Sequence, residues 1–132
     1  MLQGVYVKYL LDTNALLYFF SAPAELSARA RRIVRDEGDL RVSIASLWEI
    51  AIKQSLGKLR FNMSITRLEM LCRERSIQLV PISPVALERI KTLPDIHRDP
   101  FDRLIVAQAL EEGLAIITRD RIIPQYPVQT IW

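Results

Sequence analysis

Four acidic residues stand at positions where side chains commonly do chemistry: Asp12, Glu49, Asp102 and Asp120. Asp12 follows Tyr-Leu-Leu and Asp120 follows Ala-Ile-Ile-Thr-Arg, two segments that are typical of buried strands. Glu49 and Asp102 each lie in the expected first turn of a helix. If the four carboxylates converge, their repulsion requires either that some are protonated or that a cation neutralises them.

Carboxylate oxygens are hard ligands, which favour Mg²⁺ or Mn²⁺ over softer metals. In proteins, Mg²⁺ usually binds one or two carboxylates, keeps several waters and contacts the phosphate oxygens of a substrate. A site of this kind suits hydrolysis of a phosphodiester, because the ion can activate water and stabilise charge on the phosphate. The four acids therefore predict a divalent-metal phosphate site.

Short apolar runs alternate with helical patterns along the chain, and there is no repeat or linker. Strands alternating with helices predict an α/β protein, and near-continuous apolar strands favour a largely parallel sheet covered on both faces, a three-layer α/β/α sandwich. The expected strands are residues 5–11, 41–43, 77–80, 114–118 and 128–131. The expected helices are residues 14–20, the stretch from a cap at Ser27 to a stop at Gly38, residues 46–56, 64–75 and 84–91, and the stretch from Asp99 to Gly113.

The predicted fold brings the four acids together. In open α/β sheets, ligands bind beyond the carboxyl ends of the strands. Asp12 and Asp120 follow strands, and the helices that carry Glu49 and Asp102 start after strands or loops on the same edge. All four side chains are therefore expected at one edge of the sheet.

Each acid also has a purely structural interpretation. Asp12 can cap the following helix, and Asp120 can be a turn residue. Ser46 and Glu49 match a capping box. Asp99 before Pro100 is a typical N-cap, which leaves Asp102 in the first turn, where the helix dipole favours a negative charge.

The bulk composition is that of an ordinary soluble domain. The sequence has 132 residues, of which 50% are hydrophobic and 25% charged, and we expect residues 1–132 to form one domain. No apolar run approaches the roughly 20 residues of a membrane span, and the start does not resemble a signal peptide, so we expect a cytoplasmic protein. The net charge of +3 permits a polyanionic partner without identifying one.

The single cysteine, Cys72, excludes an internal disulfide, and its apolar helical context predicts a buried, inert thiol. Together with His97, the single histidine, it supplies too few soft ligands for a usual zinc site.

Four segments carry a resemblance to a known family. Asp12-Thr-Asn14 after an apolar strand, Trp48-Glu-Ile50, Asp102-Arg-Leu-Ile-Val-Ala-Gln-Ala109 and Ile117-Thr-Arg-Asp120 resemble, in order and spacing, the motifs of PIN domains. The match covers nearly the whole chain. Within the family the sequence is most similar to the VapC toxins of toxin–antitoxin modules, including the stretch His-x-Asp-Pro-Phe-Asp-Arg at residues 97–103.

The resemblance implies an endoribonuclease that depends on Mg²⁺, for which Mn²⁺ can substitute, and that forms a homodimer and pairs with a small antitoxin protein. It implies that Asp12 and Asp102 are the main metal ligands and that Glu49 and Asp120 complete the acidic cluster. Asn14 and Thr118 would hold the acids in place by hydrogen bonds, and Asp99 is a further candidate supporting residue beside them.

Several basic residues flank the acids: Arg98, Arg103, Arg119 and Arg121. They are candidates to hold RNA phosphates, with solvated charges that reduce the local acidity as the alternative. For His97 a structural or exposed role is favoured over a role at the site. Trp48, Phe101 and Trp132 fit a core or a dimer interface better than a base-stacking surface.

Two other functions stay open at this point. One is a Mg²⁺-dependent phosphatase or phosphoacceptor domain with Asp12 as the nucleophile, although such sites commonly have a second acid beside the first and a later lysine. The other is a non-catalytic binding module whose acids are only helix caps.

Overall fold

The computed structural model describes residues 6–132, and the five strands in this part of the chain form one sheet. The strands run in the order β3-β2-β1-β4-β5, and every pairing is parallel. Their bounds are β1 Tyr9–Leu11, β2 Leu40–Ser43, β3 Gln78–Val80, β4 Ala115–Ile117 and β5 Thr130–Ile131. The predicted α/β class with a largely parallel sheet is confirmed.

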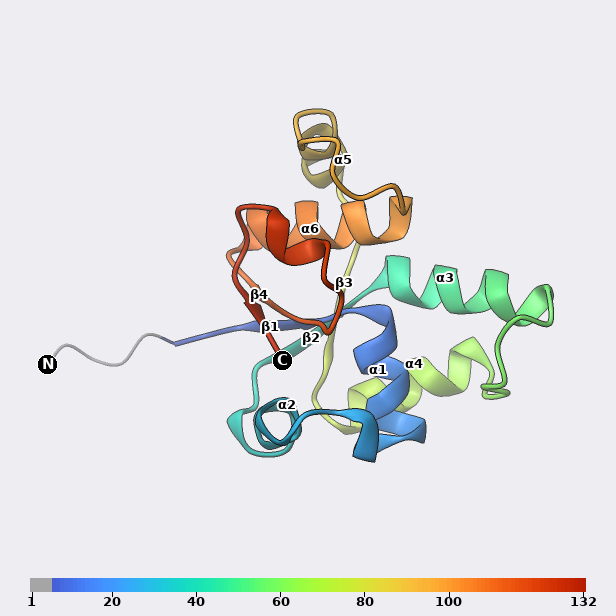
Figure 1. Cartoon of the computed structure of the whole chain (residues 1–132). Helices are drawn as coiled ribbons and strands as arrows, with labels where there is room; N and C mark the ends of the chain where they lie inside the picture. The colour runs from blue at the N-terminus through green and yellow to red at the C-terminus, as the bar shows by residue number, and fades with distance from the viewer. Residues whose placement is uncertain (1–5) are drawn as a thin grey trace, which may run out of the picture.

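Helices cover both faces of this sheet, which gives the predicted three layers. In Figure 1, α5 and α6 lie on one side of the strands, and α1, α2 and α4 lie on the other. The helices are α1 Thr13–Ser21, α2 Ala28–Arg32, α3 Ile44–Ser55, α4 Ile65–Glu74, α5 Pro84–Ile90 and α6 Pro100–Glu112, with short 3₁₀ turns at Pro23–Glu25 and Ile123–Gln125 and a π-helical turn at Ile33–Glu37. No helix in residues 6–132 is long and apolar enough to cross a membrane.

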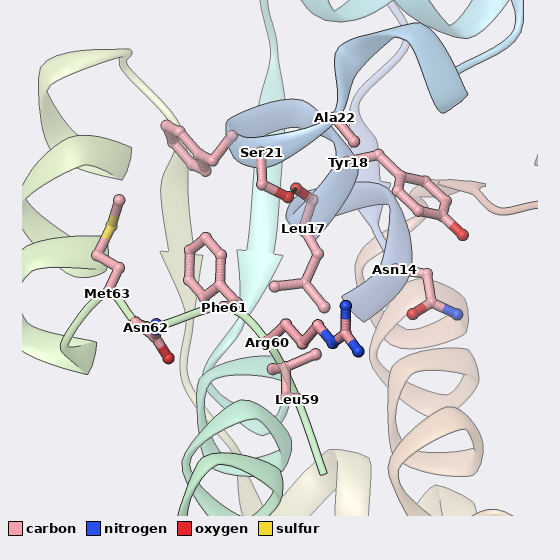
Figure 2. Close-up of a pocket in the computed structure, with 11 residues that line it drawn as sticks. Asn14, Leu17, Tyr18, Ser21, Ala22, Leu59, Arg60, Phe61, Asn62 and Met63 are labelled. Atoms are coloured by element: carbon pink, nitrogen blue, oxygen red, sulfur yellow. Dashed lines mark hydrogen bonds between the residues drawn. The ribbon is translucent and has the colours of Figure 1, made fainter. Parts of the chain in front are cut away.

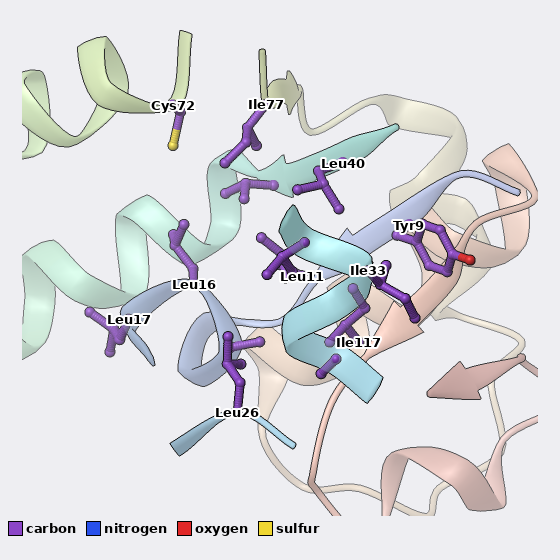
Figure 3. Close-up of a cluster of buried hydrophobic side chains, with 14 of the residues drawn as sticks. Tyr9, Leu11, Leu16, Leu17, Leu26, Ile33, Leu40, Cys72, Ile77 and Ile117 are labelled. Carbon is purple, nitrogen blue, oxygen red and sulfur yellow. The ribbon is translucent and has the colours of Figure 1, made fainter. Parts of the chain in front are cut away.

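The alternation of side chains along β1 produces two separate cores. Leu11 packs with residues of α1, α2 and α4 in the cluster drawn in Figure 3, whereas Leu10 packs against α6 on the opposite face. Cys72 is fully buried in the first of these clusters, and burial raises the pKa of its thiol to about 11. The expected inert thiol is confirmed, because a reactive cysteine needs its thiolate form.

The start of α3 differs from the expectation. The sequence predicted a helix beginning at Ser46 with a capping box to Glu49, but α3 begins at Ile44 and Ser43 is its N-cap, with Ser43 Oγ accepting a hydrogen bond from the amide of Ala45 at 2.9 Å. The reason is that β2 passes into the helix without a loop. Ser46 is therefore a buried interior residue, and Glu49 lies beyond the reach of a capping box.

The first strand is shorter than predicted. Residue 5 lies outside the described residues, and residues 6–8 precede β1. Tyr9 pairs with Leu40 and with Ala115, which are the first residues of the two neighbouring strands, so the ladder has no partners further back. The other expected helices and strands form within a few residues of the predicted bounds.

Candidate active site

The chain order reverses at β1, because β2 and β3 lie on one side of this strand and β4 and β5 on the other. Such a switch point is the usual place for a ligand in an open α/β sheet. Asp12 follows β1 at this point and is only 5% exposed. Its backbone amide donates to the carbonyl of Ile117 at the end of β4, at 3.2 Å. The first and fourth strands thus bring Asp12 close to Thr118 and Asp120.

Asp12 has two functions in the local structure. Its Oδ1 accepts a hydrogen bond from the amide of Ala15 at 2.8 Å, so it is the N-cap of α1. Its carboxylate also accepts a hydrogen bond from the Thr118 hydroxyl, whose oxygen in turn accepts from the amide of Asp120 at 3.0 Å. The capping interpretation of Asp12 is therefore correct, and it is compatible with a place in the acidic cluster.

Glu49 reaches the site from α3. Its Oε1 accepts a hydrogen bond from Thr13 Oγ1 at 2.7 Å, and its Oε2 lies 2.8 Å from the ammonium nitrogen of Lys53, one turn further along the helix. Ser46 Oγ lies 2.9 Å from the same Thr13 hydroxyl. Glu49 is 6% exposed, and a buried acid with these partners is fixed in orientation.

At the start of α6, Asp99 and Asp102 have different roles. Asp99 is the N-cap, and its Oδ1 accepts from the amides of Phe101 at 2.8 Å and of Asp102 at 3.3 Å. Pro100 occupies the first helical position, as the sequence predicted. Asp102 is thus free of capping, and its Oδ2 lies 3.1 Å from His97 Nε2.

Asp120 also contacts His97. Its Oδ1 accepts from the amides of Ile122 at 2.6 Å and of Ile123 at 3.0 Å, while its Oδ2 lies 3.2 Å from His97 Nε2. Ligand atoms of His97, Asp102 and Asp120 all lie within 4.8 Å of one another. His97 is 8% exposed, so of the structural or exposed role that the sequence favoured, the exposed alternative is wrong, and the ring lies beside Asp102 and Asp120.

The acids lie close enough for their charges to affect one another's pKa. Burial raises the pKa of Asp12 to about 6, and the charges of Asp120 and Glu49 add to this effect. Burial likewise raises the pKa of Asp102 to about 7, with further contributions from the charges of Asp99, Asp12 and Glu49. Burial acts to raise the pKa of Asp120 as well, but the amides of Ile123 and Ile122 and the His97 side chain hold it below its usual value.

This donor set fits a hard divalent cation. Burial, and to a smaller extent the neighbouring carboxylates, disfavours the charged forms of Asp12 and Asp102, and a bound divalent ion would favour them. The oxygen donors match Mg²⁺ or Mn²⁺. The cluster of possible ligand atoms within 4.8 Å of one another contains Asp102 and Asp120 together with His97, and the charges of Asp12 and Glu49 act on Asp102 from close by.

Of the three predicted supporting residues, Thr118 and Asp99 make hydrogen bonds at the site, and Asn14 does not. Asn14 is exposed, and within residues 6–132 its side chain has no hydrogen-bond partner. Sequence reasoning missed Thr13, Lys53 and Ser46. The spacing of Glu49 and Lys53 is that of an ion pair on one helix face, and this signal was available in the sequence.

The four arginines differ in their surroundings. Arg103 donates to the carbonyls of Pro94 at 3.1 Å and of Ile90 at 3.2 Å and to the Tyr126 hydroxyl at 3.2 Å. These three bonds favour a structural role for Arg103 over the RNA contact expected from the sequence. Arg98 and Arg121 are exposed and, within the described part of the chain, make no ion pair.

Arg119 is exposed but held in place. Its guanidinium donates to the Tyr18 hydroxyl and lies 4.9 Å from the Tyr18 ring centroid and 5.9 Å from that of Trp132. These three residues, together with Asp12, Asn14, Ala15 and Asp120, line a hollow of about 220 Å³ beside the acids. Arg119 therefore presents a positive charge at the edge of the acidic cluster.

The family of the chain follows from comparison with known proteins. The sequence model of the PIN domain matches residues 9–128, a stretch that contains all four acids. The chain belongs to the PIN domain family.

Proteins similar to this PIN domain include a curated ribonuclease and chains of two solved VapBC structures. "Ribonuclease VapC22" of Mycobacterium tuberculosis (strain ATCC 25618 / H37Rv) is 28% identical over 129 residues, which cover 93% of this chain and 97% of the relative. The crystal structure of VapBC2 from Rickettsia felis, bound to a DNA fragment from its promoter, contains a chain with a TM-score of 0.70 at 15% identity, covering 95% of this chain and 98% of that one. A chain of DNA-bound VapBC from Salmonella typhimurium has a TM-score of 0.65 at 18% identity, covering 95% and 97%.

The position of Glu49 in this PIN domain leads to a test. Replacing Glu49 by Gln keeps the carbonyl oxygen that Thr13 can donate to and removes the negative charge. We expect the Glu49→Gln protein to stay folded and to bind Mn²⁺ at least about 10-fold more weakly. Isothermal titration of the metal-free protein with Mn²⁺ measures this change.

The matched control for that test is Glu69→Gln. Glu69 pairs with Arg73 at the same helical spacing, at 3.1 Å, on the exposed face of α4 away from the acids. An equal loss of Mn²⁺ affinity in both variants, or no loss in Glu49→Gln, would show that Glu49 has no part in the metal site.

Proposed function

We propose that this chain is an endoribonuclease that depends on Mg²⁺, or on Mn²⁺ in its place, and that it is the toxin of a toxin–antitoxin pair. The observation that carries the proposal is the convergence of four acids at the carboxyl edge of the sheet of a PIN domain, where Asp12 and Asp102 take up protons more readily than usual. Helix capping can explain the position of Asp12, which caps α1. It cannot explain Glu49 or Asp102, because Ser43 and Asp99 cap the helices that carry them.

Asp12 and Asp102 would hold the ion, and Glu49 and Asp120 would complete its negative surroundings. When bound, a divalent ion supplies positive charge that activates water and offsets the charge on the phosphate. The chain's own residues orient the acids: Thr13 and Lys53 hold Glu49, Thr118 holds Asp12, and the amides of Ile122 and Ile123 hold Asp120.

RNA as the substrate is supported by the name of the 28% identical relative, a ribonuclease. The exposed cations around the acids add a physical argument, because contacts from basic side chains to phosphates fix the register of a nucleic acid on a protein. We assign phosphate contacts to Arg98, Arg119 and Arg121. Arg119 is the best placed of these, since Tyr18 and Trp132 fix it beside Asp12 and Asp120.

An antitoxin protein is the proposed partner, because the similar solved structures are toxin–antitoxin complexes. A hollow of about 550 Å³ between α1 and residues 59–63 has a largely apolar lining that includes Leu17, Leu59 and Phe61, as Figure 2 shows. Asn14 and Tyr18 line both this hollow and the one beside the acids, so a segment bound here would run next to the active site. A homodimer, a single domain over residues 1–132 and a cytoplasmic location stay part of the proposal.

Cleavage of single-stranded RNA tests the proposed activity. We expect the purified protein to cut RNA internally with Mg²⁺ or Mn²⁺, to stop when EDTA is added and to resume when the metal is restored. The matched control is Asp12→Asn, since asparagine caps a helix as well as aspartate but lacks the charge. Undiminished cleavage in EDTA would contradict the metal mechanism. Labelling of Asp12 by a small phosphodonor, without RNA cleavage, would favour the phosphoacceptor alternative.

A further inference from the structure

His97 lies in the loop between α5 and α6, and two hydrogen bonds of its own fix its position. Its backbone amide donates to the Tyr126 hydroxyl at 2.8 Å, and its ring Nδ1 accepts a hydrogen bond from the amide of Asp99 at 3.1 Å. Arg103 fastens the same loop through the Pro94 carbonyl and also donates to the Tyr126 hydroxyl. The imidazole is therefore held as a rigid part of the site.

The contact at Nδ1 determines which ring nitrogen carries the proton. A backbone amide can only donate, so Nδ1 is the acceptor and Nε2 carries the hydrogen. Nε2 faces Asp102 Oδ2 at 3.1 Å and Asp120 Oδ2 at 3.2 Å. One N–H group is thus shared between two carboxylates, one at the start of α6 and one after β4.

We propose that His97 is a positioning residue, whose Nε2–H holds the carboxylates of Asp102 and Asp120 together before the metal binds, and that it is not itself a metal ligand. Two negative carboxylates repel each other, and a shared donor between them offsets this repulsion. Their position is then set before the ion arrives, so less reorganisation accompanies binding. This positioning role of His97 depends on the metal site that we assign to the proposed function.

The geometry separates this role from ligation. The ligand atoms of His97, Asp102 and Asp120 are close enough to surround one ion, but a nitrogen that carries a proton has no lone pair to offer a metal. Ligation by Nε2 would require the proton to move to Nδ1, where the amide of Asp99 already points. An oxygen-only site around Mg²⁺ or Mn²⁺ agrees with this assignment.

The first test observes the ring directly. His97 is the single histidine of the chain, so the imidazole of tag-free protein gives one set of NMR signals. We expect long-range ¹H–¹⁵N correlations to show the Nε2–H tautomer without metal and also with saturating Mg²⁺, which is diamagnetic. A proton on Nδ1, or loss of the Nε2–H form when Mg²⁺ binds, would overturn the proposal.

The second test uses two substitutions that divide the ring's contacts. A glutamine amide can reach the place of Nε2 and donate to the carboxylates, whereas an asparagine carbonyl can reach the place of Nδ1 and accept from Asp99. We expect His97→Asn to weaken Mn²⁺ binding by about 10- to 100-fold, and we expect His97→Gln to rescue it to within about threefold of the wild type.

Equal losses in the two variants, or unchanged Mn²⁺ affinity in His97→Asn, would contradict the proposal. Melting temperatures of the metal-free variants distinguish a loss of fold from a loss of positioning. If a variant fails to fold, the NMR measurement on the wild type still tests the proposed tautomer. RNA cleavage is measured in parallel. Absence of cleavage by the wild type would refute the proposed function, while the tautomer and the Mn²⁺ affinities would still decide the role of His97.

Discussion

Asp102→Asn is expected to reduce metal-dependent RNA cleavage by at least about 100-fold while the fold stays intact. Asp102 makes no cap, and burial, followed by the charges of Asp99, Asp12 and Glu49, raises its pKa to about 7. An uncharged amide of nearly the same shape removes the charge that a cation needs. Mn²⁺ affinity, cleavage rate and melting temperature together measure the effect.

The neighbouring acid provides the control for this experiment. Asp99 is the N-cap of α6, and asparagine caps as well as aspartate, so Asp99→Asn is expected to keep most of the activity and stability. Asp99→Ala is expected to cost about 1 kcal/mol of stability through loss of the cap. If Asp99→Asn loses Mn²⁺ binding and Asp102→Asn retains it, the assignment of the two carboxylates is reversed.

Without metal, the protein is expected to lose stability as the pH rises from about 4 to about 7. The pKa of Asp12 is raised to about 6 and that of Asp102 to about 7, from 3.8 in the unfolded chain. The folded state therefore binds these protons more tightly than the unfolded state, and the stability they contribute is fully present below pH 3.8 and is lost as the pH passes through 6 and 7. The lowered pKa of Asp120 acts in the opposite direction, but only at pH values below 3.8.

Divalent metal is expected to reverse this loss. At a free Mn²⁺ concentration about 100 times its dissociation constant, binding stabilises the folded state by about 2.7 kcal/mol, which raises the melting temperature by several degrees. The gain should be larger at pH 7.5 than at pH 5, where protons compete with the ion for Asp12 and Asp102. Melting curves at both pH values, with and without Mn²⁺, measure it. In Asp102→Asn, both the pH dependence and the stabilisation by metal should be smaller. A stabilisation by Mn²⁺ that does not depend on pH would contradict the assignment of Asp12 and Asp102 to the metal site.

Local sequence patterns were sufficient to predict much of the fold. Proline and glycine marked the ends of α6, and the apolar runs marked β1 and β4, so the sequence predicted that Asp12 and Asp120 would lie at one edge. The error at α3 arose because two serines three residues apart can both begin a helix. The choice of Ser43 depends on β2 running directly into α3, which is a tertiary feature.

The supporting residues of the site were harder to predict. Thr13 and Ser46 meet only after α1 and α3 pack together, and nothing in their local sequence distinguishes them from ordinary helix residues. His97 bridges two acids that belong to different parts of the chain. Hydrogen bonds between residues far apart in sequence leave no local pattern, so the sequence alone favoured a structural or exposed role for His97.

The central position of β1 has a consequence for the order in which the protein becomes active during synthesis. Tyr9 pairs with Ala115 and Leu11 with Ile117. One edge of β1 therefore has no partner strand until β4 has been synthesised. Contacts between such distant segments form late, because a long loop must close first. A nascent chain that still lacks β4 carries Asp12 without Thr118 and Asp120. In a PIN domain of this topology, the acidic cluster therefore assembles only after β4 has been synthesised.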